Sequence, residues 1–322
     1  MSGIEHRFVM TNGIRMHIAE CGSGPLVVLC HGFPELWYSW RHQLPALAAA
    51  GFHAVAPDQR GYGQTECPQE IREYNIFNLV GDMVGLVHAL GEERTVIIGH
   101  DWGSTVTAHC GLLRPDMFYK VVQLSVPFLP RPGGNMPPTD IMRKIYGDEI
   151  FYQVMFQEPD LVEGQMAEAG AYKVMRSTLY VNSGDPPPDR RWKFTYKKGE
   201  KFTDHMFLPE RLPPWLNEQD VDYFASEFGR TGFRGGLNWY RNIDFNWKMT
   251  PFLEGAKLNQ PTLFIAGEVD PVLTMYRGPF EKMEKNVPGL WKKVVLPGAG
   301  HWVNQERVRE CNELILEFLR QP

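Results

Sequence analysis

The sequence has no excess of positive charge, few cysteines and no long hydrophobic run. It carries 33 lysines and arginines against 38 acidic residues, which excludes the basic surface that nucleic-acid binding needs. The five cysteines are an odd number, and no two are spaced as C-x-x-C. That pattern disfavours a disulfide framework or a structural zinc site and favours a reducing compartment. No apolar run approaches the roughly 20 residues of a membrane span. We therefore expect a cytoplasmic protein with no membrane span and no signal peptide.

Apolar runs alternate with helical patterns in the first third of the chain and again near its end. The runs are hydrophobic on both faces, which is typical of buried parallel strands. Helical periodicity marks residues 76–90 and 304–319. Strands alternating with helices predict an α/β fold, with a mostly parallel central sheet flanked by helices. The predicted strands are residues 15–20, 25–30, 53–58, 95–98, 121–126, 261–266 and 293–296.

A long stretch without convincing parallel-strand runs separates Val126 from Pro261. Connections inside a domain are usually about 4–6 residues long, so this stretch needs structure of its own. Residues 139–157, 161–179 and 218–228 look helical. We therefore predict an α/β core from residues 1–127 and 251–322, interrupted by a mostly helical lid at residues 128–250, called the insertion below.

One motif carries the chemistry. Gly99–Gly103 follows a predicted strand and precedes a helix. The nucleophile elbow, a sharp turn of pattern G-x-nucleophile-x-G, has the same position between a strand and a helix. Asp101 stands at the nucleophile position of this pattern. The elbow's usual partners, an acid and then a histidine, follow in chain order as Asp270 and His301. Each residue has an ordinary alternative: a helix N-cap for Asp101, a turn for Asp270, with Glu268 as the rival acid, and a core histidine for His301.

An aspartate nucleophile indicates the kind of electrophile. With a reference pKa of about 3.9, a carboxylate is already an anion at pH 7. It suits displacement at an alkyl carbon, as in an epoxide or a haloalkane, and forms an alkyl ester on Asp101. His301 would then activate water to hydrolyse the ester, while Asp270 orients the imidazole.

Several further segments carry a resemblance to a known family. The chain resembles the soluble epoxide hydrolases of the α/β-hydrolase fold over nearly its whole length. The segments in the insertion are the specific part, since those at residues 31–35, 60–63 and 99–103 also occur in related dehalogenases. The resemblance implies conversion of an epoxide and water to a vicinal diol. The matching segments are residues 31–35, 60–63, 99–103, 151–159, 236–242 and 300–302.

The resemblance also implies roles for single residues. Tyr152 and Tyr240 correspond to the two tyrosines that donate to the epoxide oxygen; their alternative role is aromatic packing. The backbone N–H groups of Phe33 and Trp102 form an oxyanion hole, a role compatible with pocket packing. Glu35 corresponds to a residue that helps to position water, although a solvated turn glutamate is the alternative. Pro34 follows a cis peptide bond in the family.

Aromatic and sulfur-containing residues predict the character of the substrate pocket. We expect Trp37, Met155, Phe156 and Trp239 to line an apolar cleft beside Trp102. The expected partners are a small apolar epoxide and water, and the proposed steps require neither a metal nor an organic cofactor. The chain is expected to be a monomer or a homodimer.

Three alternatives remain beside the epoxide hydrolase. A haloalkane or haloacid dehalogenase shares the aspartate nucleophile, but Phe33 has no side-chain N–H to cradle a halide. A serine esterase is disfavoured because Ser104 lies three residues beyond the tip of the elbow. A non-catalytic relative of the same fold that binds a ligand has no need of Asp101, Asp270 and His301 together.

Overall fold

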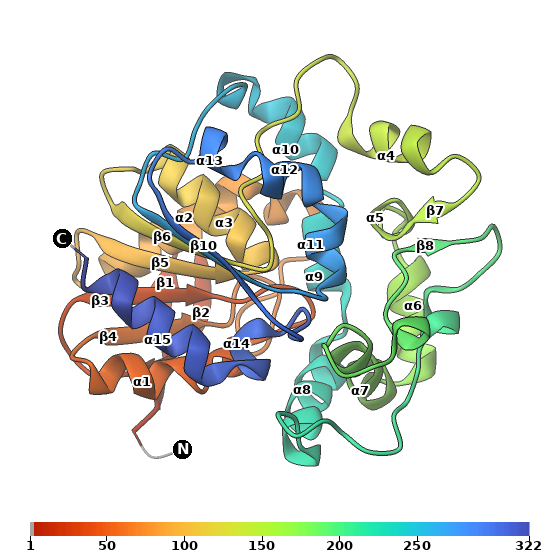
Figure 1. Cartoon of the computed structure of the whole chain (residues 1–322), viewed down its shortest axis with the longest axis horizontal. Coiled ribbons are helices and arrows are strands. Elements are labelled where there is room, and N and C mark those ends of the chain that lie inside the picture. Colours follow the sequence, from red (N-terminus) through yellow and green to blue (C-terminus); the bar gives the residue numbers. More distant parts are fainter. Residues whose placement is uncertain (1–2, 322) are drawn as a thin grey trace.

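The computed structural model describes residues 3–321 and is built around one large sheet (Figure 1). Its eight strands follow the order β1-β2-β4-β3-β5-β6-β9-β10. β2 pairs antiparallel with both β1 and β4, whereas all other neighbours are parallel. The predicted α/β class is therefore confirmed. The strands are β1 (Glu5–Thr11), β2 (Ile14–Cys21), β3 (Leu26–Cys30), β4 (His53–Pro57), β5 (Thr95–His100), β6 (Phe118–Leu124), β9 (Thr262–Gly267) and β10 (Leu290–Leu296).

The central strands are apolar because both faces of the sheet are covered. Every residue of β3, β5 and β9 is buried. α1 (Gln43–Ala49) packs against α15 (Val308–Leu319) on one side, and α2 (Ile76–Ala89) packs against α3 (Trp102–Leu113) on the other (Figure 1). Burial on both sides explains why these strands read as unbroken hydrophobic runs.

Most helices outside this core lie between β6 and β9. In Figure 1, α4 to α8 form a layer beside the sheet, to the right. The division into a core and an insertion at residues 128–250 stays a prediction. The elements are α4 (Pro138–Tyr146), β7 (Ile150–Phe151), α5 (Tyr152–Met155), α6 (Leu161–Ala169), α7 (Ala171–Val181), β8 (Thr195–Tyr196), α8 (Glu218–Thr231), α9 (Arg234–Tyr240) and α10 (Ile243–Met249).

The remaining elements are short. After β9 the chain forms α11 (Pro271–Met275), α12 (Arg277–Glu281), α13 (Met283–Asn286) and α14 (Val303–Glu306). Single 3-10 turns lie at Trp37–Trp40, Ile71–Tyr74, Pro188–Arg190, Phe202–His205 and Pro251–Leu253. Among residues 3–321, no helix has the length and hydropathy needed to cross a bilayer.

Several predicted boundaries were wrong. Residues 139–157 are α4, the strand β7 and α5 rather than one helix. The predicted helix at 161–179 is broken at Gly170, whose φ of +87° no continuing helix can adopt. Residues 304–319 are likewise split, between α14 and α15. β1 was missed because five of its seven side chains are exposed, among them Phe8 and Met10, so apolar and polar residues do not alternate along it.

Candidate active site

The elbow places Asp101 in a strained turn between β5 and α3. Its φ of +52° and ψ of −120° are unusual for a residue with a Cβ atom. The flanking glycines are required by close backbone contacts. A Cβ on Gly99 would lie 2.2 Å from the carbonyl oxygen of Gly103, and one on Gly103 would lie 2.0 Å from that of Cys30. The Asp101 side chain makes no N-cap hydrogen bond to α3.

The two oxygens of the Asp101 carboxylate have different surroundings. Oδ1 accepts a hydrogen bond from the backbone N–H of Phe33 at 2.9 Å, and the N–H of Trp102 also stabilises the carboxylate. Oδ2 lies 3.7 Å from Nε2 of His301. Burial raises the pKa of Asp101, while His301, His100 and the two N–H groups oppose that rise. Oδ1 is therefore bound by a backbone donor, while Oδ2 faces the histidine.

His301 and Asp270 meet from neighbouring strands. Nδ1 of His301 lies 3.2 Å from Oδ1 of Asp270, which also caps α11 by accepting from the N–H of Val272. Burial lowers the pKa of His301, but the carboxylates of Asp270 and Asp101 outweigh burial and raise it to about 9. Glu268, the rival acid, is exposed and binds the N–H of Gly298 instead.

Ser125 is a site residue that the sequence analysis missed. β6 ends at Leu124 rather than at Val126, because Ser125 has a φ of +70°. Its Oγ lies 2.5 Å from Oδ2 of Asp270 and 2.8 Å from Nδ1 of His301. A hydroxyl has one hydrogen, so it donates to the carboxylate and accepts from the imidazole N–H. The available signal was its place at the carboxyl end of β6, beside β9.

Glu306, which was also missed, holds in place the loop at residues 300–302 that contains His301, called the histidine loop below. Its carboxylate accepts hydrogen bonds from the backbone N–H groups of Gly300 and Trp302, on either side of His301. It also accepts from the N–H of Gly184, at 2.8 Å. Burial raises the pKa of Glu306 to about 7, although these N–H groups oppose the rise. This side chain therefore joins the histidine loop to the segment after α7.

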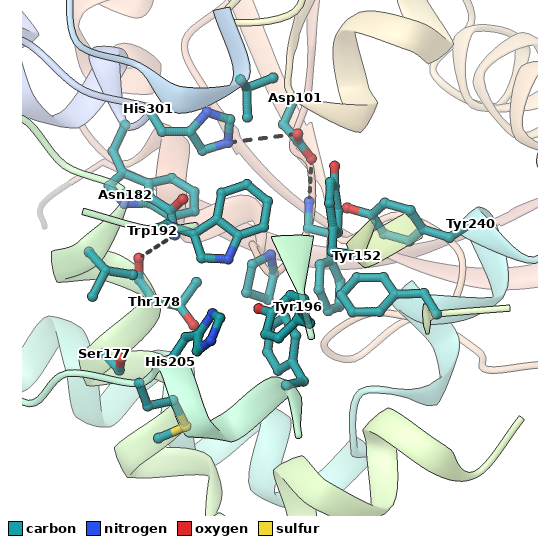
Figure 2. Close-up of a pocket in the computed structure, with 18 residues that line it drawn as sticks. Asp101, Tyr152, Ser177, Thr178, Asn182, Trp192, Tyr196, His205, Tyr240 and His301 are labelled. Atoms are coloured by element: carbon teal, nitrogen blue, oxygen red, sulfur yellow. Dashed lines mark hydrogen bonds and ion pairs between the residues drawn. The ribbon is translucent and has the colours of Figure 1, made fainter. Parts of the chain in front are cut away.

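Tyr152 and Tyr240 lie across from Asp101, with their hydroxyl groups directed towards it (Figure 2). Tyr152 begins α5 and Tyr240 ends α9, so two different helices bring them together. Burial raises the pKa of both phenols well above the usual value, so both keep their protons at neutral pH. Nε2 of Gln153 donates to Oη of Tyr152 at 2.9 Å, which leaves the phenolic proton free to be donated elsewhere.

Glu35 is buried beneath the elbow, so the alternative of a solvated turn glutamate was wrong. Its Oε1 binds the N–H of Gly32 and lies 2.6 Å from Nδ1 of His100. Burial opposes ionisation of Glu35, but His100 brings its pKa down to about 2. Within the described residues, Oε2 has no hydrogen-bond partner. The water-positioning role of Glu35 stays a prediction. The peptide bond between Phe33 and Pro34 is cis, as expected.

Two cavities meet at the nucleophile. Asp101, Tyr152, Tyr240 and Val272 line both of them. The small cavity, of about 60 Å³, continues past Trp192 (Figure 2). The large cavity, of about 340 Å³, runs on the other side of Asp101 between α3, α4 and α10. The small cavity is also lined by Phe33, Pro34, Phe156, Ser177, Thr178, Val181, Asn182, Tyr196, Phe202, His205, Met206, His301 and Trp302.

Three of the four predicted lining residues were wrong. Phe156 lines the small cavity, but consecutive helical residues point about 100° apart, so Met155 turns to a separate groove. Trp37 packs away from the cavities, with its indole N–H bound to Oη of Tyr223. The indole N–H of Trp239 donates to the carbonyl oxygen of Arg60, and its ring packs edge-on against Trp102. Trp102 does line the large cavity.

Comparison with known proteins agrees with this fold and site. Residues 25–175 match the family model described as the alpha/beta hydrolase fold. The chain is similar to epoxide hydrolase A of Mycobacterium tuberculosis, with 43% identity covering 99% of this chain and 98% of the relative. It is 41% identical to epoxide hydrolase 1 of Siraitia grosvenorii, with both chains fully covered.

A solved structure gives the same result. The crystal structure of epoxide hydrolase A from Mycobacterium thermoresistibile superposes with a TM-score of 0.92 at 44% identity, covering 98% of each chain. The fold and the elbow define an α/β-hydrolase-fold enzyme. Within that class, this chain belongs to the epoxide hydrolase family, which confirms the resemblance noted in the sequence.

Proposed function

We propose that the enzyme converts an epoxide and water to a vicinal diol through an ester on Asp101. Oδ2 attacks a ring carbon, a carbon–oxygen bond of the epoxide breaks, and an Oδ2–carbon bond forms. This choice of oxygen is supported by the contacts of the carboxylate, because Oδ1 is bound by the N–H of Phe33 and Oδ2 is not. Oδ1 then becomes the carbonyl oxygen of the ester and lies in the oxyanion hole.

Opening the epoxide releases an alkoxide, which needs a proton. Tyr152 and Tyr240 are proposed to donate it, because both phenols are protonated and both line the cavities on either side of Asp101. The aromatic walls exclude bulk water, which strengthens these hydrogen bonds. A proton donated from this position stabilises the negative charge that develops on the epoxide oxygen in the transition state. It stabilises the bound epoxide less, so it speeds ring opening.

The second step hydrolyses the ester. Water attacks the carboxyl carbon of Asp101 and gives one proton to Nε2 of His301. The bond between that carbon and Oδ2 then breaks, and the departing oxygen takes the proton from His301 to complete the diol. The second proton of the water, left on the Asp101 carboxyl group, returns to the phenolate, which restores the carboxylate and both phenols. Ester formation removes the negative charge of Asp101, which is one cause of the raised pKa of His301. His301 therefore becomes a better proton acceptor when the ester forms. Asp270 and Ser125 hold its ring through Nδ1.

The observation that carries the proposal is the convergence of Asp101, His301 and two phenols on one point between two cavities. A panel of styrene-type and alkyl epoxides, assayed for diol beside Asp101→Ala, tests it. The wild type should form diol and Asp101→Ala should form none. Halide release from brominated alkanes without diol formation would indicate a dehalogenase instead. Retention of a bound molecule without turnover of any epoxide would indicate a ligand-binding relative.

A further inference from the structure

The large cavity follows one face of α3, the helix that begins after Asp101. Thr105, His109 and Leu112 all line it. Residues four and then three or four positions apart share a helix face, so these side chains continue the line that starts at Asp101. His109 lies eight residues after Asp101, which is about 12 Å along the helix axis at 1.5 Å per residue. The opposite wall is mostly apolar and includes Phe128, Met142 and Ile243.

The hydrogen bonding of His109 leaves one ring nitrogen as a free acceptor. Nδ1 lies 2.8 Å from the carbonyl oxygen of Thr105. A carbonyl only accepts, so Nδ1 carries the hydrogen and Nε2 of the neutral ring carries a lone pair. Burial lowers the pKa of His109, which keeps the ring neutral. Nε2 has no hydrogen-bond partner anywhere in residues 3–321, yet it is not among the fully enclosed polar atoms.

Two other polar side chains along this cavity have partners within the described residues. Arg131 pairs with Glu254 at 3.0 Å, and Oη of Tyr276 accepts from Gln153 at 3.2 Å. A neutral acceptor that faces a mostly apolar wall discriminates strongly between substrates, because a buried polar group that meets no partner costs free energy.

We propose that His109 forms a subsite that accepts a hydrogen bond from a hydroxyl or N–H group on the longer arm of the substrate. This inference rests on the proposed function and narrows its substrate class. The preferred epoxide carries an apolar arm that ends in a hydrogen-bond donor about two helical turns from the oxirane. The substrate is then apolar at the oxirane end and along the arm, as expected, and polar only at the tip of the arm.

The test uses three epoxides that differ only at the end of one arm: a hydroxyl, its methyl ether, and a methyl group, each over several arm lengths. The measured quantity is kcat/KM for diol formation by the wild-type enzyme. At the arm length that reaches His109, the hydroxyl should be preferred over the ether and the alkane by about three- to tenfold. The ether is decisive because it has an oxygen but no hydrogen to donate.

Variants assign the preference to this side chain. His109→Leu should remove it, and His109→Gln, whose amide oxygen accepts at a similar reach, should restore part of it. Thr105→Val is the matched control, since it removes a neighbouring hydroxyl from the same wall and should leave the preference unchanged. The comparison of hydroxyl and ether on the wild type needs no variant to fold.

The possible failures are distinct. If all three epoxides are turned over with no preference for the hydroxyl at any arm length, the inference is overturned and the proposed function stands. The same holds if His109→Leu keeps the wild-type preference. If the wild type forms diol from none of them, the proposed function itself is overturned, together with the inference.

Discussion

Replacing Asp101 with asparagine should lower the pKa of His301 by a large amount. Asparagine keeps the size of the side chain but removes a negative charge whose Oδ2 lies 3.7 Å from Nε2 of His301. Burial lowers the pKa of this histidine, and the charges of Asp270 and Asp101 together raise it to about 9. A single opposite charge at this range changes a pKa by about 1 to 3, so the expected value in Asp101→Asn is about 6 to 8.

The consequence for mechanism follows from the same charge. The ester on Asp101 is neutral, as asparagine is, so Asp101→Asn reports the electrostatics of the intermediate. At neutral pH His301 is protonated in the free enzyme, below its pKa of about 9. It loses that proton more readily once the ester has formed. A base that becomes available only at the intermediate acts in the hydrolysis step.

Nuclear magnetic resonance titration of ring-labelled histidine measures this pKa directly, and the spectrum of His301→Gln assigns the signal. Glu268→Gln is the control, because Glu268 is an exposed carboxylate of the same loop region and its removal should leave the pKa of His301 near 9. A pKa that stays near 9 in Asp101→Asn would refute the reasoning, because ester formation could then not release the base.

Four further outcomes are expected. His301→Gln should accumulate the ester, so mass spectrometry finds the enzyme heavier by one substrate. Tyr152→Phe or Tyr240→Phe should slow alkylation about 100-fold and ester hydrolysis less, as resolved by stopped-flow tryptophan fluorescence. Ser125→Ala should slow ester hydrolysis about tenfold and spare alkylation in single-turnover experiments, because it removes a hydrogen bond to the His301–Asp270 pair. Glu306→Ala should lower the free energy of unfolding by about 3 kcal/mol in urea denaturation, because two buried N–H groups and one part-buried N–H group lose their acceptor.

Each of these outcomes has a clear opposite. An unmodified mass of His301→Gln after incubation with substrate contradicts the two-step scheme. Unchanged alkylation in both tyrosine variants removes the phenols from ring opening. Equal slowing of both steps in Ser125→Ala assigns the serine a merely structural role. A change below about 1 kcal/mol in Glu306→Ala means that water replaces the lost acceptor.

The sequence predicts those features that depend on local pattern. The buried strands read as continuous apolar runs, and the elbow around Asp101 is a short motif with its glycines at fixed spacing. Asp270 and His301 follow strands whose carboxyl ends meet at one edge of the sheet, so their proximity to Asp101 follows from topology.

Features that depend on packing between distant segments are not predictable in this way. Trp37 and Trp239 are large and aromatic, but tertiary contacts turn them away from the cavities. Ser125 reads as part of a strand, since a positive φ in a non-glycine residue leaves no mark in the sequence. Glu306 also binds the N–H of Gly184, which lies 122 residues away in the chain, and no short motif reveals that contact.

A single turnover in heavy-oxygen water, with enzyme in excess over epoxide, tests the central claim most directly. If water attacks the carboxyl carbon of Asp101, the peptide that contains Asp101 gains one heavy oxygen and the diol from that first turnover gains none. Heavy oxygen in the diol, with an unlabelled Asp101 peptide, would contradict the account, because water would then have attacked the epoxide itself.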